Sequence, residues 1–202
     1  CIHHQSDSDN QHTAFHISHV LFGKITPSGK LTTTFPRSVG QLPLFYNHLN
    51  TGRPDPDSHI FNRYASNYLD ESNEPLYPFG YGLSYTDFVY GELQISSETL
   101  PKNGELTVSV TVTNKGNYDG YETVQLYLRD IYAEVARPMK ELKGFERIFL
   151  KSGESRDVKF VITKDDLKFY NSELHYVYEP GEFDVMVGPN SRDVQTKSFQ
   201  AE

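Results

Sequence analysis

Tryptophan is absent from this chain of 202 residues, and cysteine occurs only once, as Cys1. A single cysteine excludes an internal disulfide and leaves the redox compartment open. Basic residues are scarce too: 19 lysines and arginines stand against 27 aspartates and glutamates, a formal net charge of −8. A field of that sign disfavours nucleic acid and anionic membrane surfaces, so neither is expected as a partner.

Long apolar runs are also missing. No stretch of about 18 consecutive apolar residues occurs, so no membrane span is expected. The sequence shows no recognisable signal peptide. The position of Cys1 fits the acylated first residue of a processed lipoprotein, and it also fits an arbitrary start of the sequence. Of these two interpretations the second is preferred.

Tyrosine and phenylalanine are abundant, with 14 and 13 residues in a chain that is 37% hydrophobic, which is enough for a folded core. They are concentrated in "LYPFGYGLSYTDF", residues 76–88, where Pro78, Gly80 and Gly82 interrupt regular structure. The segment is too aromatic for a solvated linker and too rich in glycine for a helix or strand. It fits a junction between two domains or an aromatic-anchored loop inside one.

The first part of the chain has few periodic elements. Residues 13–23 place apolar side chains at helical spacing and predict a helix that ends near Gly23. Residues 31–35 predict a short strand. Residues 37–78 are irregular, and we expect long loops there that are anchored by their own aromatic side chains, a pattern typical of functional or covered segments.

The second part alternates between apolar and polar residues. Residues 106–113 (LTVSVTVT) do so strictly, and 121–130, 155–163 and 182–188 repeat the pattern of half-buried strands. Turn signals separate them, and residues 164–171 predict a short helical turn. About seven strands bounded by turns indicate a Greek-key β-sandwich, and the lack of a Cys…Trp…Cys pattern favours a fibronectin-type-III-like one.

Four motifs in this order make the sequence recognisable: "GKITPSGKLTTTFPRSVGQLPLFYNHLNTGRP", "LYPFGYGLSYTDF", "RPMKELKGFERIFLKSGES" and "YEPGEFDVMVG". Together they resemble the C-terminal region of glycoside hydrolase family 3 enzymes, in particular those of the bacterial periplasmic β-glucosidase type. The resemblance runs from about Val20 to Gly188. It implies hydrolysis of terminal β-linked glucose or related sugars with retention of configuration, in a periplasmic or extracellular location.

The resemblance also implies a division of the chain. Members of the family join a (β/α)₈ barrel, an α/β sandwich domain and a fibronectin-type-III-like domain in series. Residues 1–87 would be the tail of the α/β sandwich domain, residues 88–202 the terminal β-sandwich, and residues 76–88 the seam between them. The fold class expected is therefore mainly β, with a remnant of an α/β domain in front that exposes apolar side chains its neighbours would cover.

The catalytic groups of the family lie elsewhere. Retaining glycosidases use two carboxyl groups about 5 Å apart, and in this family they belong to the barrel and to an earlier part of the second domain. No acidic residue of this sequence matches either motif, so the chain is expected to be inactive alone. Its expected partners are the barrel and α/β domains and a β-glucoside or oligosaccharide substrate.

One loop, residues 47–72, is the best candidate for contact with substrate. Sugars are bound by planar bidentate donors, by carboxylates that accept paired hydroxyls, and by aromatic faces. The loop offers these groups in Arg53, Asp55, Asp57, Arg63 and Tyr64. A solvated surface loop with locally paired charges is the alternative. Asp70 and Glu71 are not expected to be a catalytic pair, because neighbours on an extended chain point to opposite faces.

Histidine recurs at His12, His16 and His19, which would share one face of a helix, a spacing that can bind zinc. The helix is short and its flanking tail is polar, so an exposed histidine stripe is expected instead. Asp7 and Asp9 resemble the start of a calcium loop, but the required downstream glycine and glutamate are missing. We expect neither a metal site nor a cofactor.

Two other functions compete with the glycosidase interpretation. One is a free-standing carbohydrate-binding or adhesion module. Such sandwiches present exposed aromatic platforms, often tryptophan, for which the available substitutes are Tyr118, Tyr121, Tyr127, Tyr132 and Tyr170. The other is a truncated remnant without biochemical function.

Overall fold

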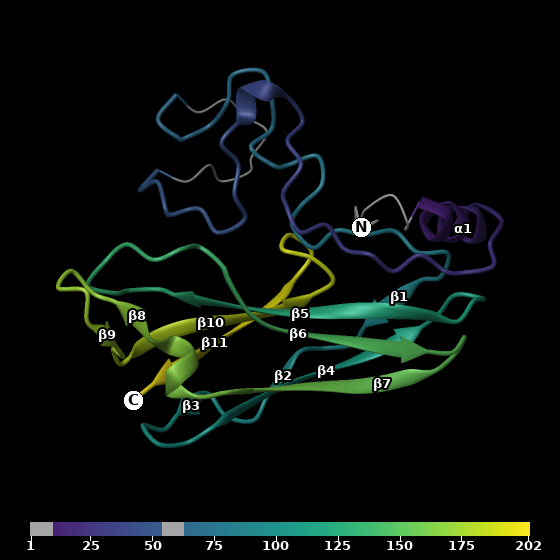
Figure 1. Ribbon diagram of the computed structural model, residues 1–202. Helices are drawn as coiled ribbons and strands as arrows, with labels where there is room; N and C mark the ends of the chain where they lie inside the picture. Colours follow the sequence, from purple (N-terminus) through teal and green to yellow (C-terminus); the bar gives the residue numbers. More distant parts are fainter. Residues whose placement is uncertain (1–9, 54–62) are drawn as a thin grey trace.

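The structure, a computed structural model, describes residues 10–53 and 63–202. Its strands β1 to β11 all lie within residues 88–202, whereas the described residues before them form one helix, one 3₁₀ turn and long irregular segments (Figure 1). Among the described residues, no helix has the length and apolar character needed to cross a membrane. The fold is mainly β, as predicted.

The helix predicted from residues 13–23 is confirmed as α1, Asn10–Leu21. It ends where Gly23 adopts a left-handed conformation with φ of 68°, which glycine reaches without steric cost. The strand predicted from residues 31–35 is wrong: only an isolated bridge, Phe35 to Tyr77, forms there. Proline and glycine in the partner segment interrupt the ladder, because Pro78 has no backbone donor. The 3₁₀ turn η2 (Val39–Gln41) follows.

One sheet of the sandwich is built around β4 (Leu106–Asn114). It pairs antiparallel with β1 (Phe88–Tyr90) and β2 (Gln94–Ile95) along one edge and with β7 (Ser155–Ile162) along the other. The alternation that predicted β4 is visible in its burial. Leu106, Val108, Val110 and Val112 are buried, while the residues between them point outward.

The second sheet has the order β3-β11-β10-β5-β6. Its strands are β3 (Thr99–Leu100), β5 (Gly120–Asp130), β6 (Glu141–Leu150), β10 (Gly181–Gly188) and β11 (Gln195–Ala201). All neighbours are antiparallel except β3 and β11, which are parallel. Figure 1 shows the two sheets as layers, with the irregular segments lying over the β5–β10 layer.

A small appendage closes one end of the sandwich. The predicted helical turn at residues 164–171 is shorter than expected: η3 covers Lys164–Leu167, and the remaining residues enter β8 (Phe169–Tyr170), which pairs with β9 (Tyr176–Val177). Thr163 and Asp166 form a capping box that fixes the start of η3.

The core lies between the two sheets. Its valine, leucine, isoleucine and phenylalanine side chains come from every long strand and are at most a few per cent exposed. Each fully buried side chain of this size stabilises the fold by about 1.5 to 3 kcal/mol. The buried core therefore stabilises the sandwich, against which the irregular segments pack.

Candidate functional site

The segment of residues 76–88, called the seam segment below, is bonded on two sides. Its backbone pairs with residues 31–35: Gly80 N donates to Leu31 O (2.8 Å), and Leu31 N donates to Tyr81 O (2.8 Å). On the sandwich side, Ser191 N donates to Phe79 O at 2.9 Å. These bonds tie the first part of the chain to the loop after β10.

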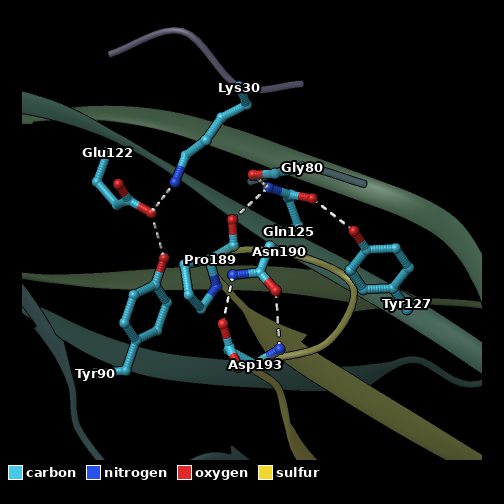
Figure 2. Close-up of polar contacts among 9 residues, drawn as sticks. All are labelled: Lys30, Gly80, Tyr90, Glu122, Gln125, Tyr127, Pro189, Asn190 and Asp193. Carbon is cyan, nitrogen blue, oxygen red and sulfur yellow. Dashed lines mark hydrogen bonds and ion pairs between the residues drawn. The ribbon is translucent and has the colours of Figure 1, made fainter. Parts of the chain in front are cut away.

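Gly80 is the point of closest approach in the seam segment. Its φ is 78°, and a Cβ added there would lie 2.0 Å from Gln125 Oε1, so any other residue would both strain the backbone and displace the Gln125 amide. Gln125 of β5 is 3% exposed. Its Nε2 donates to Gly80 O (3.2 Å) and Pro189 O (2.6 Å), and its Oε1 accepts from the Tyr127 hydroxyl (Figure 2). Burial raises the pKa of Tyr127.

A buried carboxylate makes the second link. Glu122 of β5 is 5% exposed, and its Oε1 accepts from Lys30 Nζ and from the Tyr90 hydroxyl, both at 2.9 Å (Figure 2). Burial, reinforced by the charge of Glu122, raises the pKa of Tyr90, so the phenol remains a donor. Lys30 belongs to the first part of the chain, and it therefore neutralises a charge that the sandwich has buried.

Aromatic stacking adds an apolar link. Tyr46 stacks on Phe79 with 4.3 Å between ring centroids, and its ring also meets Tyr127 edge-on at 5.8 Å. Two backbone contacts lie nearby: Met139 N donates to His48 O (2.9 Å), and Leu49 forms a bridge with Pro138. The beginning of the loop that follows is thus anchored on the sandwich.

The long loop, defined here as residues 42–75, carries the predicted substrate contacts. Arg53, Arg63 and Tyr64 are exposed, and the Arg63 guanidinium lies 5.3 Å from the Tyr64 ring centroid. Ser66 N donates to Arg53 O (2.8 Å), so the two limbs of the loop meet near these side chains. Asp55 and Asp57 lie outside the described residues.

A hollow of about 140 Å³ separates the long loop from the sandwich. Tyr46, His48 and Glu74 line it from the loop, and Lys140 and Arg192 line it from the sandwich. Lys140 Nζ donates to the Ser191 carbonyl, and burial lowers the pKa of Lys140. Ligand pockets usually measure about 300 to 1,000 Å³. The hollow is therefore too small to hold a sugar on its own.

No group of three or more His, Cys, Asp or Glu side chains suited to a metal ion occurs among the described residues. Within the predicted histidine stripe, His16 and His19 contact the Phe15 ring, with His19 at a centroid distance of 3.8 Å. The side chain of His12 lies outside the described residues.

The sequence did not single out Glu122 and Gln125, the β5 residues that bond to the first part of the chain. Their one distinguishing feature in the sequence is that they are polar residues inside a strand of β-branched and aromatic ones. The prediction of Tyr127 as an exposed aromatic platform is wrong. Tyr127 is fully buried, because Tyr46 covers the face of β5 that carries it.

Two family descriptions match the chain in series. The Glycosyl hydrolase family 3 C-terminal domain matches residues 8–85, and the Fibronectin type III-like domain matches residues 122–191. The periplasmic β-glucosidase of Salmonella typhimurium is 51% identical over 185 residues, which cover 91% of this chain and 24% of that protein. Thermostable β-glucosidase B of Acetivibrio thermocellus is 40% identical, with 90% and 24% covered.

Solved structures agree with the sequence relatives. The β-glucosidase from Listeria innocua in complex with glucose superposes with a TM-score of 0.86 at 43% identity, over 94% of this chain and 26% of that one. The chain spans about a quarter of the length of the relatives it matches. It belongs to glycoside hydrolase family 3 and corresponds to the C-terminal region of that family's β-glucosidases.

Proposed function

We propose that this chain is the C-terminal part of a retaining β-glucosidase that acts on terminal β-linked glucose or related sugars. The observation that carries the proposal is the 51% identity to a periplasmic β-glucosidase across nearly the whole chain. Relatives at 40 to 45% identity are named as β-glucosidase or β-xylosidase, so a xyloside is the second sugar to examine.

In this proposal the chain supports the reaction and does not perform the bond cleavage. Residues 1–87 form the tail of the α/β sandwich domain, and residues 88–202 form the fibronectin-type-III-like domain. The two catalytic carboxyl groups come from the barrel and from an earlier part of the α/β domain. No acidic residue of this sequence matches the motif of either group. Arg53, Arg63 and Tyr64 of the long loop contact the sugar.

Exposed apolar side chains support contact with such domains. Phe15, Leu21, Phe22, Val39 and Phe45 are between 55% and 84% exposed, and all belong to the part of the chain before the sandwich. Leu21 and Phe22 are neighbours at the end of α1, and exposed apolar side chains that lie together mark an interaction surface. The similarity to the periplasmic β-glucosidase of Salmonella typhimurium supports a periplasmic or extracellular location.

The test is a complementation assay. The chain is mixed with separately expressed residues of the Listeria innocua enzyme that precede its matching region, and an aryl β-glucoside is supplied. We expect no turnover by either part alone and turnover on mixing. A chain with Gly80→Val, which places side-chain atoms where Gln125 lies, should not complement. Turnover by the chain alone, or none on mixing, would contradict the proposal.

A carbohydrate-binding module is the second candidate, and one observation favours it. Tyr170 and Tyr176 face each other across β8 and β9 with ring centroids 5.0 Å apart, and they are 65% and 55% exposed. Exposed tyrosine faces can stack on pyranose rings. Retardation of the chain in gels containing soluble β-glucan, lost in Tyr170→Ala, would favour this function over the first.

A further inference from the structure

The described residues of the long loop, 42–53 and 63–75, form almost no regular secondary structure, so their backbone polar groups need other partners. Two side-chain amides supply several of these partners. We propose that Gln41 and Asn73 are positioning residues that hold the two limbs of the long loop together and thereby place Arg53 and Arg63 for contact with the sugar. This inference rests on the proposed function and names the residues on which its substrate contacts depend.

Gln41 closes the base of the loop. It lies at the end of η2 and is 1% exposed. Its Oε1 accepts from Arg37 N, and its Nε2 donates to Ser72 O (2.7 Å) and to Glu74 O (3.3 Å). Arg37 Nε donates to the same Glu74 carbonyl at 3.0 Å. The amide thus joins a segment that precedes the loop to the segment that ends it.

Asn73 extends this hydrogen-bond network to residues 66–68 of the loop. Its Nδ2 donates to Ser66 O (2.8 Å), and its Oδ1 accepts from Tyr68 N (3.3 Å). The Tyr68 hydroxyl donates to the backbone carbonyl of Gln41 at 3.2 Å, so Gln41 and Asn73 belong to one hydrogen-bond network. Ser66 N then donates to Arg53 O, and this bond joins the two limbs.

A solvated surface loop would not need this arrangement. Arg53, Arg63 and Tyr64 are exposed, whereas the Gln41 amide at the base of the loop is buried with three side-chain hydrogen bonds. A buried amide is costly to hold unless both of its ends are satisfied. The buried, hydrogen-bonded amide of Gln41 therefore favours a fixed position for the exposed Arg53 and Arg63 side chains of the loop.

Near-isosteric substitutions separate position from packing. Gln41→Glu keeps an acceptor for Arg37 N but places a carboxylate oxygen against the Ser72 and Glu74 carbonyls. Asn73→Asp does the same against the Ser66 carbonyl, and Asn73 is less buried, so this variant guards against a failure of the first to fold. Gln94→Glu on the exposed face of β2 is the matched control.

The first measurement is amide hydrogen exchange on the chain itself. We expect the Ser66 and Tyr68 amides to exchange about tenfold faster in Gln41→Glu and in Asn73→Asp. The amides of Leu31 and Gly80, which join the seam segment to residues 31–35, and those of the sandwich strands should change less than about twofold. Unchanged exchange at Ser66 and Tyr68 in both variants would overturn the inference.

The second measurement uses a hybrid in which this chain replaces the C-terminal quarter of the Listeria innocua β-glucosidase. Both variants should raise KM for laminaribiose about fivefold or more with kcat within about twofold, because a misplaced binding group weakens ground and transition states equally. Gln94→Glu should change neither. Faster exchange with unchanged KM would overturn the positioning role and leave the proposed function standing. A hybrid that is inactive without any substitution would overturn both.

Discussion

The part of the chain before residue 88 and the sandwich that follows satisfy their backbones by different means. In the sandwich, ladders such as the β4–β7 and β5–β6 pairs do so, and side chains are left to fill the core. Backbone groups of the long loop bond instead to side chains, those of Asn73 within the loop and of Gln41 just before it. The comparison teaches that the loop depends on a few polar groups, whereas the sandwich depends on apolar volume.

The largest expected effect is on the core of the sandwich. Val124→Asp places a charge at a fully buried position of β5, and we expect the free energy of unfolding to fall by about 4 kcal/mol or more. Thermal unfolding followed by circular dichroism measures it. Val89→Asp, at a position of β1 that is 49% exposed, is the control and should change stability by about 0.5 kcal/mol or less. Equal losses would contradict the core assignment.

The next effect is on the seam. Gly80→Ala combines a strained φ of 78° with a Cβ 2.0 Å from Gln125, and we expect a loss of about 3 kcal/mol. Gly153→Ala separates the two causes, because Gly153 has the same φ with no atom within 4 Å of the added Cβ. It should cost about 1 kcal/mol. Similar losses in chemical denaturation of the two variants would show that the close approach at Gly80 is unimportant.

The ion pair across the seam should have a smaller effect. Lys30→Met leaves Glu122 buried with the Tyr90 hydroxyl as its remaining described side-chain partner, and we expect a loss of about 2 kcal/mol. Adding Glu122→Gln should recover most of it, since the uncompensated charge is then gone. Denaturant midpoints of the two single variants and the double variant form the required cycle. Strictly additive losses would mean that the two side chains do not interact.

The smallest effect is a pH dependence within the sandwich. Burial raises the pKa of Asp130 from 3.8 to about 6, against the opposing charge of Arg137 and with Glu179 and Glu141 adding to the rise. The folded state therefore holds the proton longer than the unfolded chain, and stability is lost as pH rises from about 4 to 7. Both carboxylate oxygens of Asp130 are buried although the residue as a whole is partly exposed, and with this partial screening by solvent we expect a loss of about 1 kcal/mol.

Asp130→Asn provides the check on that dependence. The difference in unfolding free energy between the unmodified chain and this variant should shrink toward pH 4 and grow toward pH 7, with the variant the more stable at neutral pH. A difference that stays constant from pH 4 to 7 would mean that Asp130 titrates normally.

The sequence by itself determined the β-sandwich, because a period of two is a property of neighbouring residues. The alternation in residues 106–113 appears directly as buried and exposed faces of β4. The helix and its end at Gly23 were determined in the same local way. The family motifs went further and identified the C-terminal region of a glycoside hydrolase, since the seam segment combines aromatic residues with glycines in an uncommon order.

Only the tertiary structure decided which polar residues matter. Gln125 occupies an outward position of a strand, and its burial follows from the approach of Gly80, which is distant in sequence. Tyr127 is buried and is not an exposed aromatic platform, because Tyr46 covers it. Gln41 has no distinctive local pattern at all. Burial and hydrogen-bond partners depend on segments that meet after folding, and a pattern in neighbouring residues does not encode those meetings.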